Sequence, residues 1–360
     1  QLRSRQPSPL TCLRRRRARF GASAGSAGIH SGVRHPLVPC RAPIILAPML
    51  RLHPYEYHRP ERLADALALL SEHGSAAMPI AGGTDLVPNM KHRLFTPAHL
   101  VSLRRVVELQ GFDEEADGAL RIGAAESLDA VSRDSAVLAR WPMLAYACAR
   151  ISGPQLRRAG TLGGNVCLDT RCTYYNQTWF WRKSLGFCLK KDGDVCHVVK
   201  GGTRCVAAHS ADGATALCAL GAELEFAGPV GEIRKVQIDE LFTSDGVWNR
   251  RLESGEILVA IRIPAPSPGA RGAFRKLRVR NAIDFPLANI AAHADLDDER
   301  RVIALRLFVS GMGSYPRKVG KVEDLARGSR LTPEIIESIA DQAYRQCHPL
   351  TNITVDAEWR

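Results

Sequence analysis

The sequence has 360 residues, which is enough for two or three compact units with cores of their own. Hydrophobic residues make up 45% and charged residues 24%, as in ordinary globular proteins. The longest apolar stretch, residues 42–50, is far shorter than the roughly 20 residues of a membrane span. We therefore expect no transmembrane helix and no membrane partner.

The net charge of +12 arises mainly from the N-terminal segment. Residues 1–48 contain nine arginines and no lysine or acidic residue, whereas the remainder has 40 basic and 37 acidic residues. A run such as residues 14–17 is compatible with nucleic-acid contact or with a transit peptide. The first methionine is Met49, and a patterned sequence begins directly after it. We predict that residues 1–48 are a disordered or non-native leader, and we expect no nucleic-acid function.

The first part of the chain after Met49 has the pattern of a β-α-β unit. A helix is expected at residues 61–70, because Leu63, Leu67 and Leu70 share one helical face. A short strand at 77–81 then enters a first glycine turn, residues 82–85. A helix from 86 to about 94 and a strand at 99–103 complete the unit.

The central part alternates strands and helices. An acidic turn ending at Gly118 predicts a hairpin, and Ser127 is a candidate helix cap. One helix is expected from residue 137 to 150, followed by a second glycine turn at 160–165 and a cysteine-rich segment at 167–205. A helix at 212–220 and strands at 223–226, 233–238 and 257–263 follow.

The run of prolines in residues 264–269 is the best linker in the sequence. We place the domain boundary there, with one domain at 49–266, carrying the 167–205 insert, and another at 270–360. The second domain has three alternating strand candidates, 274–280, 288–296 and 302–309. A helix capped by Thr332 follows them, with Ile335, Ile339 and Tyr344 predicted on its buried face.

The two glycine turns are the candidate nucleotide site, because glycine allows backbone N–H groups to approach phosphate oxygens closely. Either turn alone is equally compatible with a simple reversal of the chain. Neither fits the G-x-G-x-x-G pattern or the P-loop. Only the pair of turns together predicts nucleotide binding.

Four segments in order resemble the FAD-binding subunits of the xanthine dehydrogenase and carbon monoxide dehydrogenase family. They are PIAGGTDLVP (79–88), RRAGTLGGN (157–165), ADGATALCALGAELE (211–225) and FRKLRVRNAIDFPLANIAAH (274–293). The resemblance covers essentially residues 49–360. It implies an α+β fold with two FAD-binding subdomains of the vanillyl-alcohol-oxidase/PCMH-like type, then a CO-dehydrogenase-flavoprotein-like antiparallel sheet with helices.

The resemblance also implies which residues bind FAD. The first turn would wrap the pyrophosphate, the second would complete the cradle, and two later residues would contact other parts of the flavin nucleotide. These residues are Pro79, Ile80, Ala81, Gly82, Gly83, Thr84, Asp85, Leu86, Thr161, Gly164, Asn165, Asp212 and Lys276. Lys276 is interpreted either as a positive charge near a reduced flavin or as an ordinary solvated lysine. No catalytic acid, base or nucleophile is expected in this chain.

Five cysteines crowd into the 39 residues of the insert. This insert resembles the one that distinguishes the β subunits of 4-hydroxybenzoyl-CoA reductases, which holds a four-iron four-sulfur cluster. The resemblance implies Cys172, Cys188, Cys196 and Cys205 as the ligands. Cys167, expected on the strand that leaves the second glycine turn, is given no role, and His197 is expected to face solvent or to lie behind the ligands.

Two other interpretations of the cysteines stay open. Four thiolates also bind zinc, although only Cys167 and Cys172 approach the close spacing of a zinc knuckle. Disulfides are disfavoured, because nothing in the sequence indicates secretion. The aromatic residues of the insert, such as Trp179 and Trp181, would either shield a cluster from water or form a small local core.

The resemblance implies an electron-transfer subunit of a cytoplasmic oxidoreductase complex. Its partners would be a large molybdopterin-binding subunit and a small 2Fe-2S subunit in a heterotrimer that dimerises, with ferredoxin as the electron donor. The complex would reduce 4-hydroxybenzoyl-CoA to benzoyl-CoA. The alternatives are an oxidative molybdenum hydroxylase of the xanthine or carbon monoxide dehydrogenase type and, from another class, a zinc-stabilised binding protein.

Overall fold

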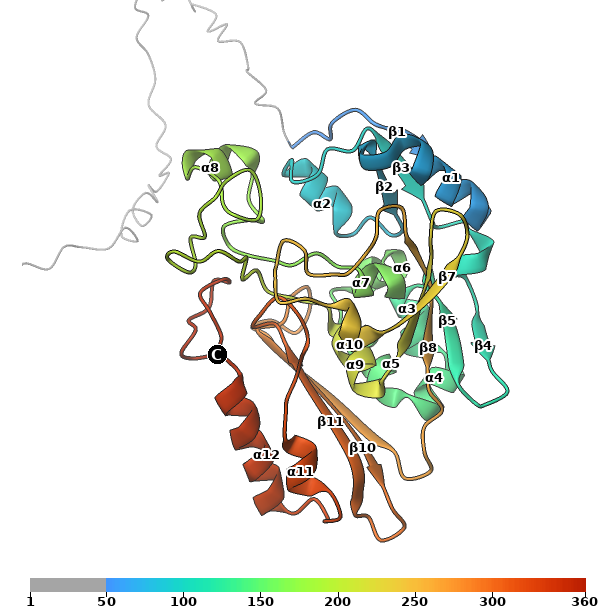
Figure 1. The fold of residues 1–360 in the computed structure, drawn as a ribbon, viewed down its shortest axis with the longest axis vertical. Coiled ribbons are helices and arrows are strands. Elements are labelled where there is room, and N and C mark those ends of the chain that lie inside the picture. Colours follow the sequence, from blue (N-terminus) through green and yellow to red (C-terminus); the bar gives the residue numbers. More distant parts are fainter. Residues whose placement is uncertain (1–49) are drawn as a thin grey trace, which may run out of the picture. The chain divides into compact units, whose positions relative to one another are not determined.

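The computed structural model describes residues 50–360, which belong to one compact unit. The predicted leader, residues 1–48, lies outside the described residues. Within residues 50–360, none of the helices has the length and apolar character that a bilayer crossing requires. Three sheets and the helices packed on them make up the unit (Figure 1).

The first sheet is the predicted β-α-β unit. It contains β1 (Glu56–His58), β3 (His99–Ser102) and β2 (Ala77–Ile80) in that spatial order, all parallel. Helix α1 (Leu63–His73) packs on this sheet through Ala66, Leu67 and Leu70, and α2 (Leu86–Lys91) follows the first glycine turn. That turn therefore lies at the carboxyl end of β2, the edge where parallel sheets usually bind ligands.

The second sheet has five strands in the order β4-β5-β8-β6-β7, and neighbouring strands are antiparallel. The predicted hairpin is present as β4 and β5. Every residue of β8 except Arg262 is buried, as expected for a central strand. The strands are β4 (Phe112–Glu114), β5 (Leu120–Gly123), β6 (Glu223–Ala227), β7 (Ile233–Gln237) and β8 (Ile257–Ile263).

Short helices lie between the strands of the second sheet along the chain, α3 to α9 between β5 and β6 and α10 between β7 and β8. Ser127 caps the first of them as predicted, since its hydroxyl accepts a hydrogen bond from the Ala130 N–H at 3.0 Å. The helices are α3 (Leu128–Arg133), α4 (Ser135–Arg140), α5 (Pro142–Ala149), α6 (Pro154–Ala159), α7 (Leu162–Val166), α8 (Trp179–Ser184), α9 (Asp212–Leu220) and α10 (Ile238–Leu241).

The single helix expected at residues 137–150 is wrong. The chain leaves the helical conformation at Trp141 and starts again at Pro142, so α4 and α5 are separate. Proline disfavours a helical conformation at the residue before it, and it suits the first turn of a new helix. The break lets the Trp141 indole bury itself and donate a hydrogen bond of 3.0 Å to the Pro264 carbonyl.

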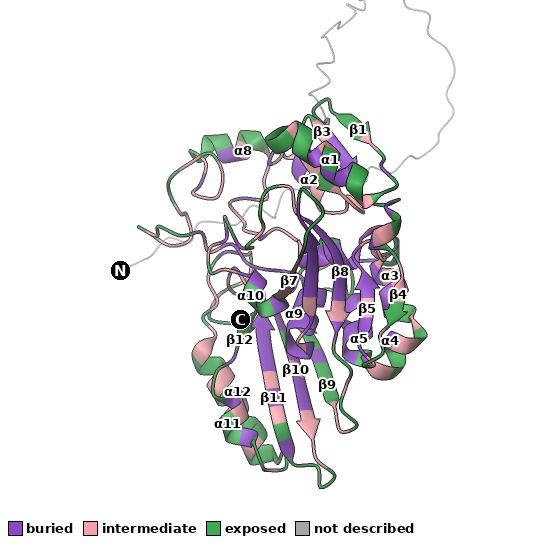
Figure 2. Cartoon of the chain, turned by 45° about the vertical axis from the view of Figure 1, so that its right-hand side comes forward, coloured by how far each residue is buried: buried purple, intermediate pink, exposed green. Residues whose placement is uncertain are grey.

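The C-terminal part is an antiparallel sheet in the order β12-β11-β10-β9, with two helices on one face. Its elements are β9 (Arg271–Leu277), β10 (Ala288–Leu296), β11 (Val302–Ser310), β12 (Arg317–Lys318), α11 (Val322–Ala326) and α12 (Pro333–Gln346). Ile335 and Ile339 pack on this sheet as predicted, but Tyr344 is exposed and Ala343 takes the inward position. Figure 2 shows the long strands mostly buried and α12 mostly open to solvent.

Helix α9 joins the two parts of the unit. All nine of its residues are buried, and it contacts α5 and α7 on one side and β10 and β11 on the other. The main hydrophobic core accordingly includes Leu217 of α9, Ile261 of β8 and Phe308 of β11. The predicted α+β fold with a C-terminal antiparallel sheet is confirmed.

Candidate cofactor sites

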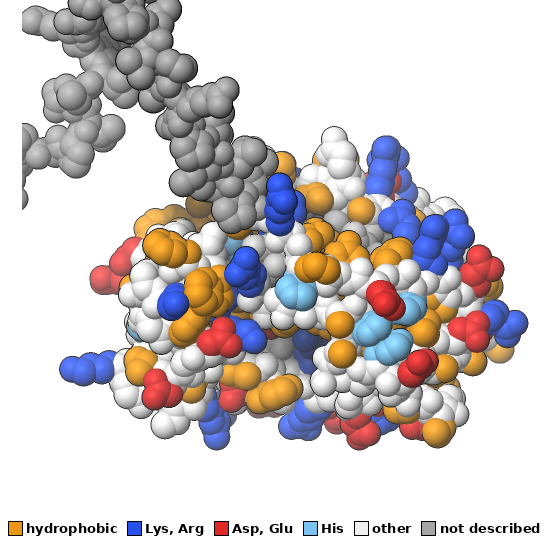
Figure 3. Space-filling model, turned by 90° about the horizontal axis from the view of Figure 1, so that it is seen from above, with side chains coloured by type: hydrophobic (Ala, Val, Ile, Leu, Met, Phe, Trp, Pro, Cys, Tyr) orange, Lys and Arg blue, Asp and Glu red, His pale blue; other side chains and the backbone are white. Residues whose placement is uncertain are grey.

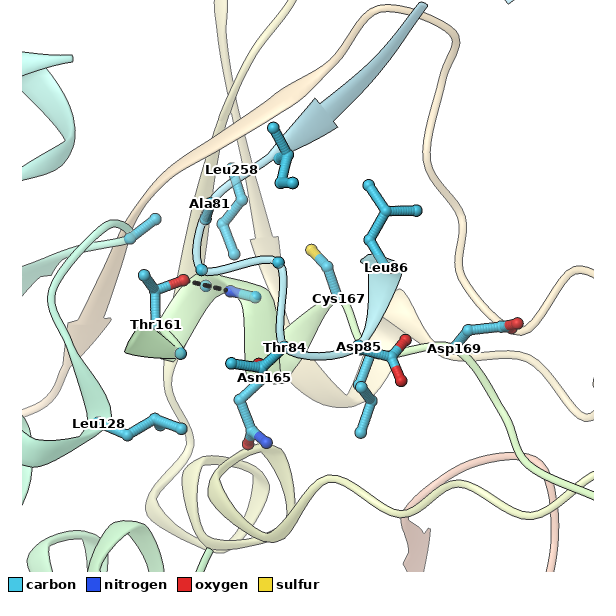
Figure 4. A pocket seen from close by; sticks show the side chains of 18 of the residues that line it. Ala81, Thr84, Asp85, Leu86, Leu128, Thr161, Asn165, Cys167, Asp169 and Leu258 are labelled. Carbon is cyan, nitrogen blue, oxygen red and sulfur yellow. Dashed lines mark hydrogen bonds between the residues drawn. The ribbon is translucent and has the colours of Figure 1, made fainter. Parts of the chain in front are cut away.

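A cavity of about 490 Å³ lies where the first glycine turn meets α7, α9 and β9. This is within the usual range of ligand pockets. All thirteen residues predicted to bind the flavin nucleotide line it. Figure 4 shows the first turn crossing the pocket, with Thr161 and Asn165 on the facing element.

The first turn offers a row of unpaired backbone donors. Within residues 50–360, the N–H groups from Ala81 to Leu86 have no hydrogen-bond acceptor. Residues 81–86 are partly exposed and line the pocket, and several unpaired N–H groups gathered at one concavity suit an anion. The first turn of α2, which begins at Leu86, adds the partial positive charge of a helix N-terminus.

The two glycine segments pack against each other. A β-carbon on Gly82 would overlap the Ala159 carbonyl oxygen and would lie 2.8 Å from the Gly160 α-carbon. Gly83 has φ +66°, a left-handed conformation that other residues adopt only with strain. Gly82 is thus required for close backbone packing, and Gly83 is required for the path of the chain.

The second glycine segment is a short capped helix rather than an open turn. Thr161 caps α7 by accepting a hydrogen bond from the Gly164 N–H at 3.0 Å (dashed in Figure 4). The N–H groups of Leu162, Gly163 and Asn165 are also bonded within the chain. Thr161 and Asn165, the residues predicted to complete the cradle, therefore offer side chains to the pocket, namely the Thr161 hydroxyl and the Asn165 amide nitrogen.

Asp212 and Lys276 form a buried ion pair at the rim of the pocket. The Lys276 Nζ lies 2.5 Å from Asp212 Oδ2, and Asn289 Nδ2 donates to Asp212 Oδ1 at 2.8 Å. Burial raises the pKa of Asp212, and the nearby Lys276 ammonium opposes this rise. Both side chains are at most 3% exposed. The interpretation of Lys276 as a solvated lysine is therefore wrong. Its positive charge is paired with the carboxylate of Asp212.

Several pocket residues were missed by the sequence reasoning. The Arg171 guanidinium pairs with Asp85 and lies 3.8 Å from the centroid of the Phe285 ring. Burial raises the pKa of Asp85, and Arg171 offsets part of that rise. Arg250 donates to the Cys167 carbonyl, and the Ser210 hydroxyl is buried without a partner among the described residues. Phe285 lies in the segment FRKLRVRNAIDFPLANIAAH (274–293), which carries part of the family resemblance. No pattern in the sequence indicated Arg250.

The four predicted ligand cysteines come together around a second, small cavity. Cys172, Cys188, Cys196 and Cys205 all line it, and each is a free thiol. The backbone N–H groups of Val199 and Ala207 point at the sulfurs of Cys196 and Cys205, both at 3.4 Å. Such N–H···S contacts are typical of protein-bound iron–sulfur clusters and influence their potentials.

The spacing of these sulfurs bears on the metal group that they could hold. A tetrahedral zinc with Zn–S bonds of about 2.3 Å holds its sulfurs about 3.8 Å apart. Within residues 50–360, no three of these cysteine sulfurs lie within 4.8 Å of one another. A four-iron cluster stands between its thiolates and separates them further. Burial raises the pKa of Cys172 and of Cys205 to about 11, so ligand binding must displace protons.

Cys167 lies apart from the other four. It is the C-cap of α7 rather than part of a strand, and it lines the large pocket. Burial raises the pKa of its thiol. The expectation of a strand at Cys167 is wrong, but its exclusion from the cysteine cavity agrees with the prediction. His197 lines that cavity together with the four cysteines, and its Nε2 lies 2.6 Å from the Phe187 carbonyl oxygen.

The base of the insert is shared by both cavities. Arg171 and Ala208 close it with two backbone hydrogen bonds of 2.8 and 2.7 Å, so residues 171 and 172 face different cavities although they are neighbours in sequence. Farther out, the buried Arg182 of α8 donates to the carbonyls of His92 and Arg93 at the end of α2. These contacts tie the cysteine loop to the element that carries the first glycine turn.

Comparison with known proteins agrees with this arrangement. Residues 53–266 match the family described as the FAD binding domain in molybdopterin dehydrogenase. Residues 272–360 match the CO dehydrogenase flavoprotein C-terminal domain. The chain therefore belongs to the family of FAD-binding subunits of molybdenum hydroxylases.

Within this family, the relatives are medium chains of the xanthine and carbon monoxide dehydrogenase type. The xanthine dehydrogenase FAD-binding subunit of Escherichia coli O157:H7 is 30% identical over 84% of this chain and 90% of its own length. The carbon monoxide dehydrogenase medium chain of Afipia carboxidovorans is 34% identical over 66% of this chain and 67% of its own. The solved carbon monoxide dehydrogenase of Hydrogenophaga pseudoflava superposes with a TM-score of 0.70, at 27% identity, over 86% of this chain and 92% of that one.

Proposed function

We propose that this chain is the FAD- and 4Fe-4S-carrying electron-transfer subunit of a molybdenum-dependent 4-hydroxybenzoyl-CoA reductase. The observation that carries the proposal is the convergence of Cys172, Cys188, Cys196 and Cys205 on one cavity beside the flavin pocket. The family comparisons do not assign a cluster to this subunit, so the cluster is proposed from the cysteines of this chain alone.

The residues of the large pocket fit FAD. The unpaired N–H groups of residues 81–86 would hold the pyrophosphate, with Thr161 and Asn165 donating from the facing helix. The Arg250 guanidinium contributes positive charge, since it opposes the rise in the pKa of both Asp85 and Cys167. The side chains of Leu128 and Leu258 add apolar surface to the lining of the pocket.

The residues of the small cavity fit a four-iron cluster. Four thiolates meet its ligand requirement, and the two N–H···S contacts are available to stabilise their negative charge. Tyr175 is buried beside the cysteines and shields them from water. When bound, FAD exchanges one or two electrons and the cluster exchanges one, so together they supply stepwise electron transfer.

The proposed partners are a large molybdopterin-binding subunit and a small 2Fe-2S subunit, with ferredoxin as electron donor. Substrate chemistry would take place on the large subunit: two electrons and two protons convert 4-hydroxybenzoyl-CoA to benzoyl-CoA and water. This chain would bind its cofactors, hold them near each other and exclude water. It needs no acid or base of its own for the reaction.

The second candidate is a FAD subunit that works in the oxidative direction. The names of the relatives, among them a xanthine dehydrogenase subunit and carbon monoxide dehydrogenase medium chains, favour it. The two candidates differ in what the cysteine loop does. In the reductive candidate the loop is part of the electron path, and in the oxidative one it is not required for turnover.

The test is metal analysis and activity of the anaerobically purified complex. We expect about four irons in this chain, beyond those of its partners. Alanine at Cys172, Cys188, Cys196 or Cys205 should remove this iron, whereas Cys167→Ala should keep it. The four variants that lose iron should still bind most of their FAD. Reduction of 4-hydroxybenzoyl-CoA with a low-potential donor collapses in the first four variants. Zinc in place of iron, or full activity of the Cys196→Ala complex, would reject the reductase proposal. The assignment of the chain as a FAD-binding subunit would still hold.

A further inference from the structure

A cluster of three histidines lies outside both cofactor cavities. His58 ends β1, His73 ends α1 and His99 begins β3. One ring nitrogen from each lies within 4.8 Å of the others, and in the described part of the chain no other His, Cys, Asp or Glu group is so close. Figure 3 shows histidine side chains gathered on the surface over this sheet, with acidic side chains beside them.

The cluster follows from the strand register. β1 and β3 run parallel with Glu56 opposite His99, and residues 56 and 58 share one face of β1 because side chains alternate along a strand. Helix α1 brings His73 against His99, with ring centroids 3.7 Å apart and ring planes within 2° of parallel. Three separate elements therefore present imidazoles at one point.

The donor atoms have the spacing that a small transition-metal ion requires. His58 Nε2 lies 3.1 Å from His99 Nδ1, and Glu56 Oε2 lies 3.5 Å from His99 Nδ1 and 4.0 Å from His58 Nε2. A tetrahedral zinc with bonds of about 2.0–2.2 Å has ligand atoms about 3.3–3.6 Å apart. These three atoms thus approximate one face of such a tetrahedron.

His73 supplies the remaining position after a small movement. Its ring is stacked flat on His99, and two parallel rings cannot both direct an in-plane lone pair at one ion. Its side chain is partly exposed at the end of α1 and makes no side-chain hydrogen bond within residues 50–360, so turning the ring gives up only its stacking on His58 and His99.

The electrostatic surroundings favour a cation. Glu56 contributes a carboxylate, and His73 is the last residue of α1, where the helix dipole places partial negative charge. Imidazoles with one carboxylate suit zinc, copper or nickel, whereas calcium and magnesium prefer oxygen ligands alone.

We propose that His58, His73, His99 and Glu56 form a binding site for one late first-row divalent ion, most naturally Zn²⁺. The site joins α1 to β1 and to the amino end of β3. The first glycine turn lies at the carboxyl end of β2, about 10 Å away along the four residues of that strand. The ion acts as a clamp on the subdomain that carries that turn and takes no part in electron transfer. The proposal is independent of the cysteine cluster.

The experiment is calorimetric titration with Zn²⁺ of the full chain carrying its flavin and iron, after dialysis against a chelator. One zinc should bind per chain and raise the melting temperature. His58→Gln, His73→Gln and His99→Gln should each weaken binding about tenfold or more, and Glu56→Gln should weaken it less. His53→Gln, at an exposed histidine three residues before Glu56, is the matched control and should bind like the wild type.

Cobalt identifies the ligands independently of the variants. Co²⁺ in this site should show visible d–d absorption without the strong ultraviolet thiolate-to-metal band that cysteine ligation produces. Flavin content and circular dichroism show whether each variant is folded. The proposal is overturned by the absence of zinc binding, by unchanged binding in folded His73→Gln and His99→Gln, or by a thiolate band with cobalt.

Discussion

The Lys190 Nζ lies 2.7 Å from Asp169 Oδ1, and this ion pair spans the wall between the two cofactor cavities. Asp169 lines the flavin pocket, and Lys190 lines the cysteine cavity. The same ammonium group donates to Thr170 Oγ1 at 2.8 Å and to the Gly246 carbonyl at 2.6 Å, and it lies 4.6 Å from the centroid of the Tyr175 ring. All three N–H donors of the Lys190 ammonium group are thus used in hydrogen bonds within the wall that separates the two cavities.

Removing the charge of Lys190 should destabilise the protein strongly. In Lys190→Met, the carboxylate of Asp169, which is 15% exposed, loses its cation, and breaking a buried pair typically costs about 3–5 kcal/mol. Lys191→Met is the matched control, because Lys191 is 40% exposed and its pair with Asp192 is worth at most about 1 kcal/mol. Urea unfolding followed by tryptophan fluorescence measures both. Equal stability of the two variants would contradict the structural role of Lys190.

Replacing Gly82 with even the small residue alanine should lower the affinity for FAD. In Gly82→Ala, the added methyl group overlaps the Ala159 carbonyl, so the two flavin-binding segments must move apart. Overpacking of this kind costs about 1–3 kcal/mol, which corresponds to a loss of FAD affinity of about 5- to 150-fold if it falls on the bound state. Gly313→Ala is the control, since nothing lies within 4 Å of its added β-carbon. Equilibrium dialysis of FAD distinguishes them, and wild-type affinity in Gly82→Ala would refute the packing argument.

The flavin should be held without a covalent bond. Cys167 is the cysteine that lines the flavin pocket, and burial raises the pKa of its thiol, which keeps it protonated and a poor nucleophile. Acid precipitation should release all flavin into the supernatant, from wild type and from Cys167→Ala alike. Flavin that stays in the wild-type pellet and leaves it in the variant would identify a cysteinyl link.

His209 should make the protein less stable in mild acid. It is completely buried, neither ring nitrogen has a partner within the described residues, and burial lowers its pKa from 6.5 to about 3. Between these values the unfolded chain binds a proton that the folded chain does not, so this stability contribution is lost as the pH falls below 6.5. The loss between pH 7 and pH 5 is about 2 kcal/mol from this residue.

The variant His209→Leu removes that proton and should show a correspondingly smaller loss of unfolding free energy between pH 7 and pH 5. His348→Leu, at an exposed histidine, should keep the wild-type pH dependence. Urea unfolding at the two pH values provides the comparison. Identical behaviour of His209→Leu and wild type would mean that the His209 ring binds its proton in the folded protein as readily as in the unfolded chain.

Much of the fold was predictable because its signals are local. The periodicity of Leu63, Leu67 and Leu70, the cap at Ser127 and the proline run after β8 each act within a few residues. The order of the motifs then indicated the family, and all thirteen predicted flavin residues line one pocket. The errors were local as well: Pro142 divides a helix, and Tyr344 faces solvent although its spacing suits the buried face.

The sequence alone determined which residue types are available, namely a pair of glycine segments, a five-cysteine loop and an ordinary charge balance after residue 48. Only the tertiary structure decided which of them meet. Arg171 reaches Asp85 from 86 residues away, Lys276 is neutralised by Asp212, and His58, His73 and His99 converge through the register of β1 and β3. Such pairings depend on strand register and helix packing, where a shift of one residue turns every side chain of a strand to the opposite face, so no local pattern in the sequence specifies them.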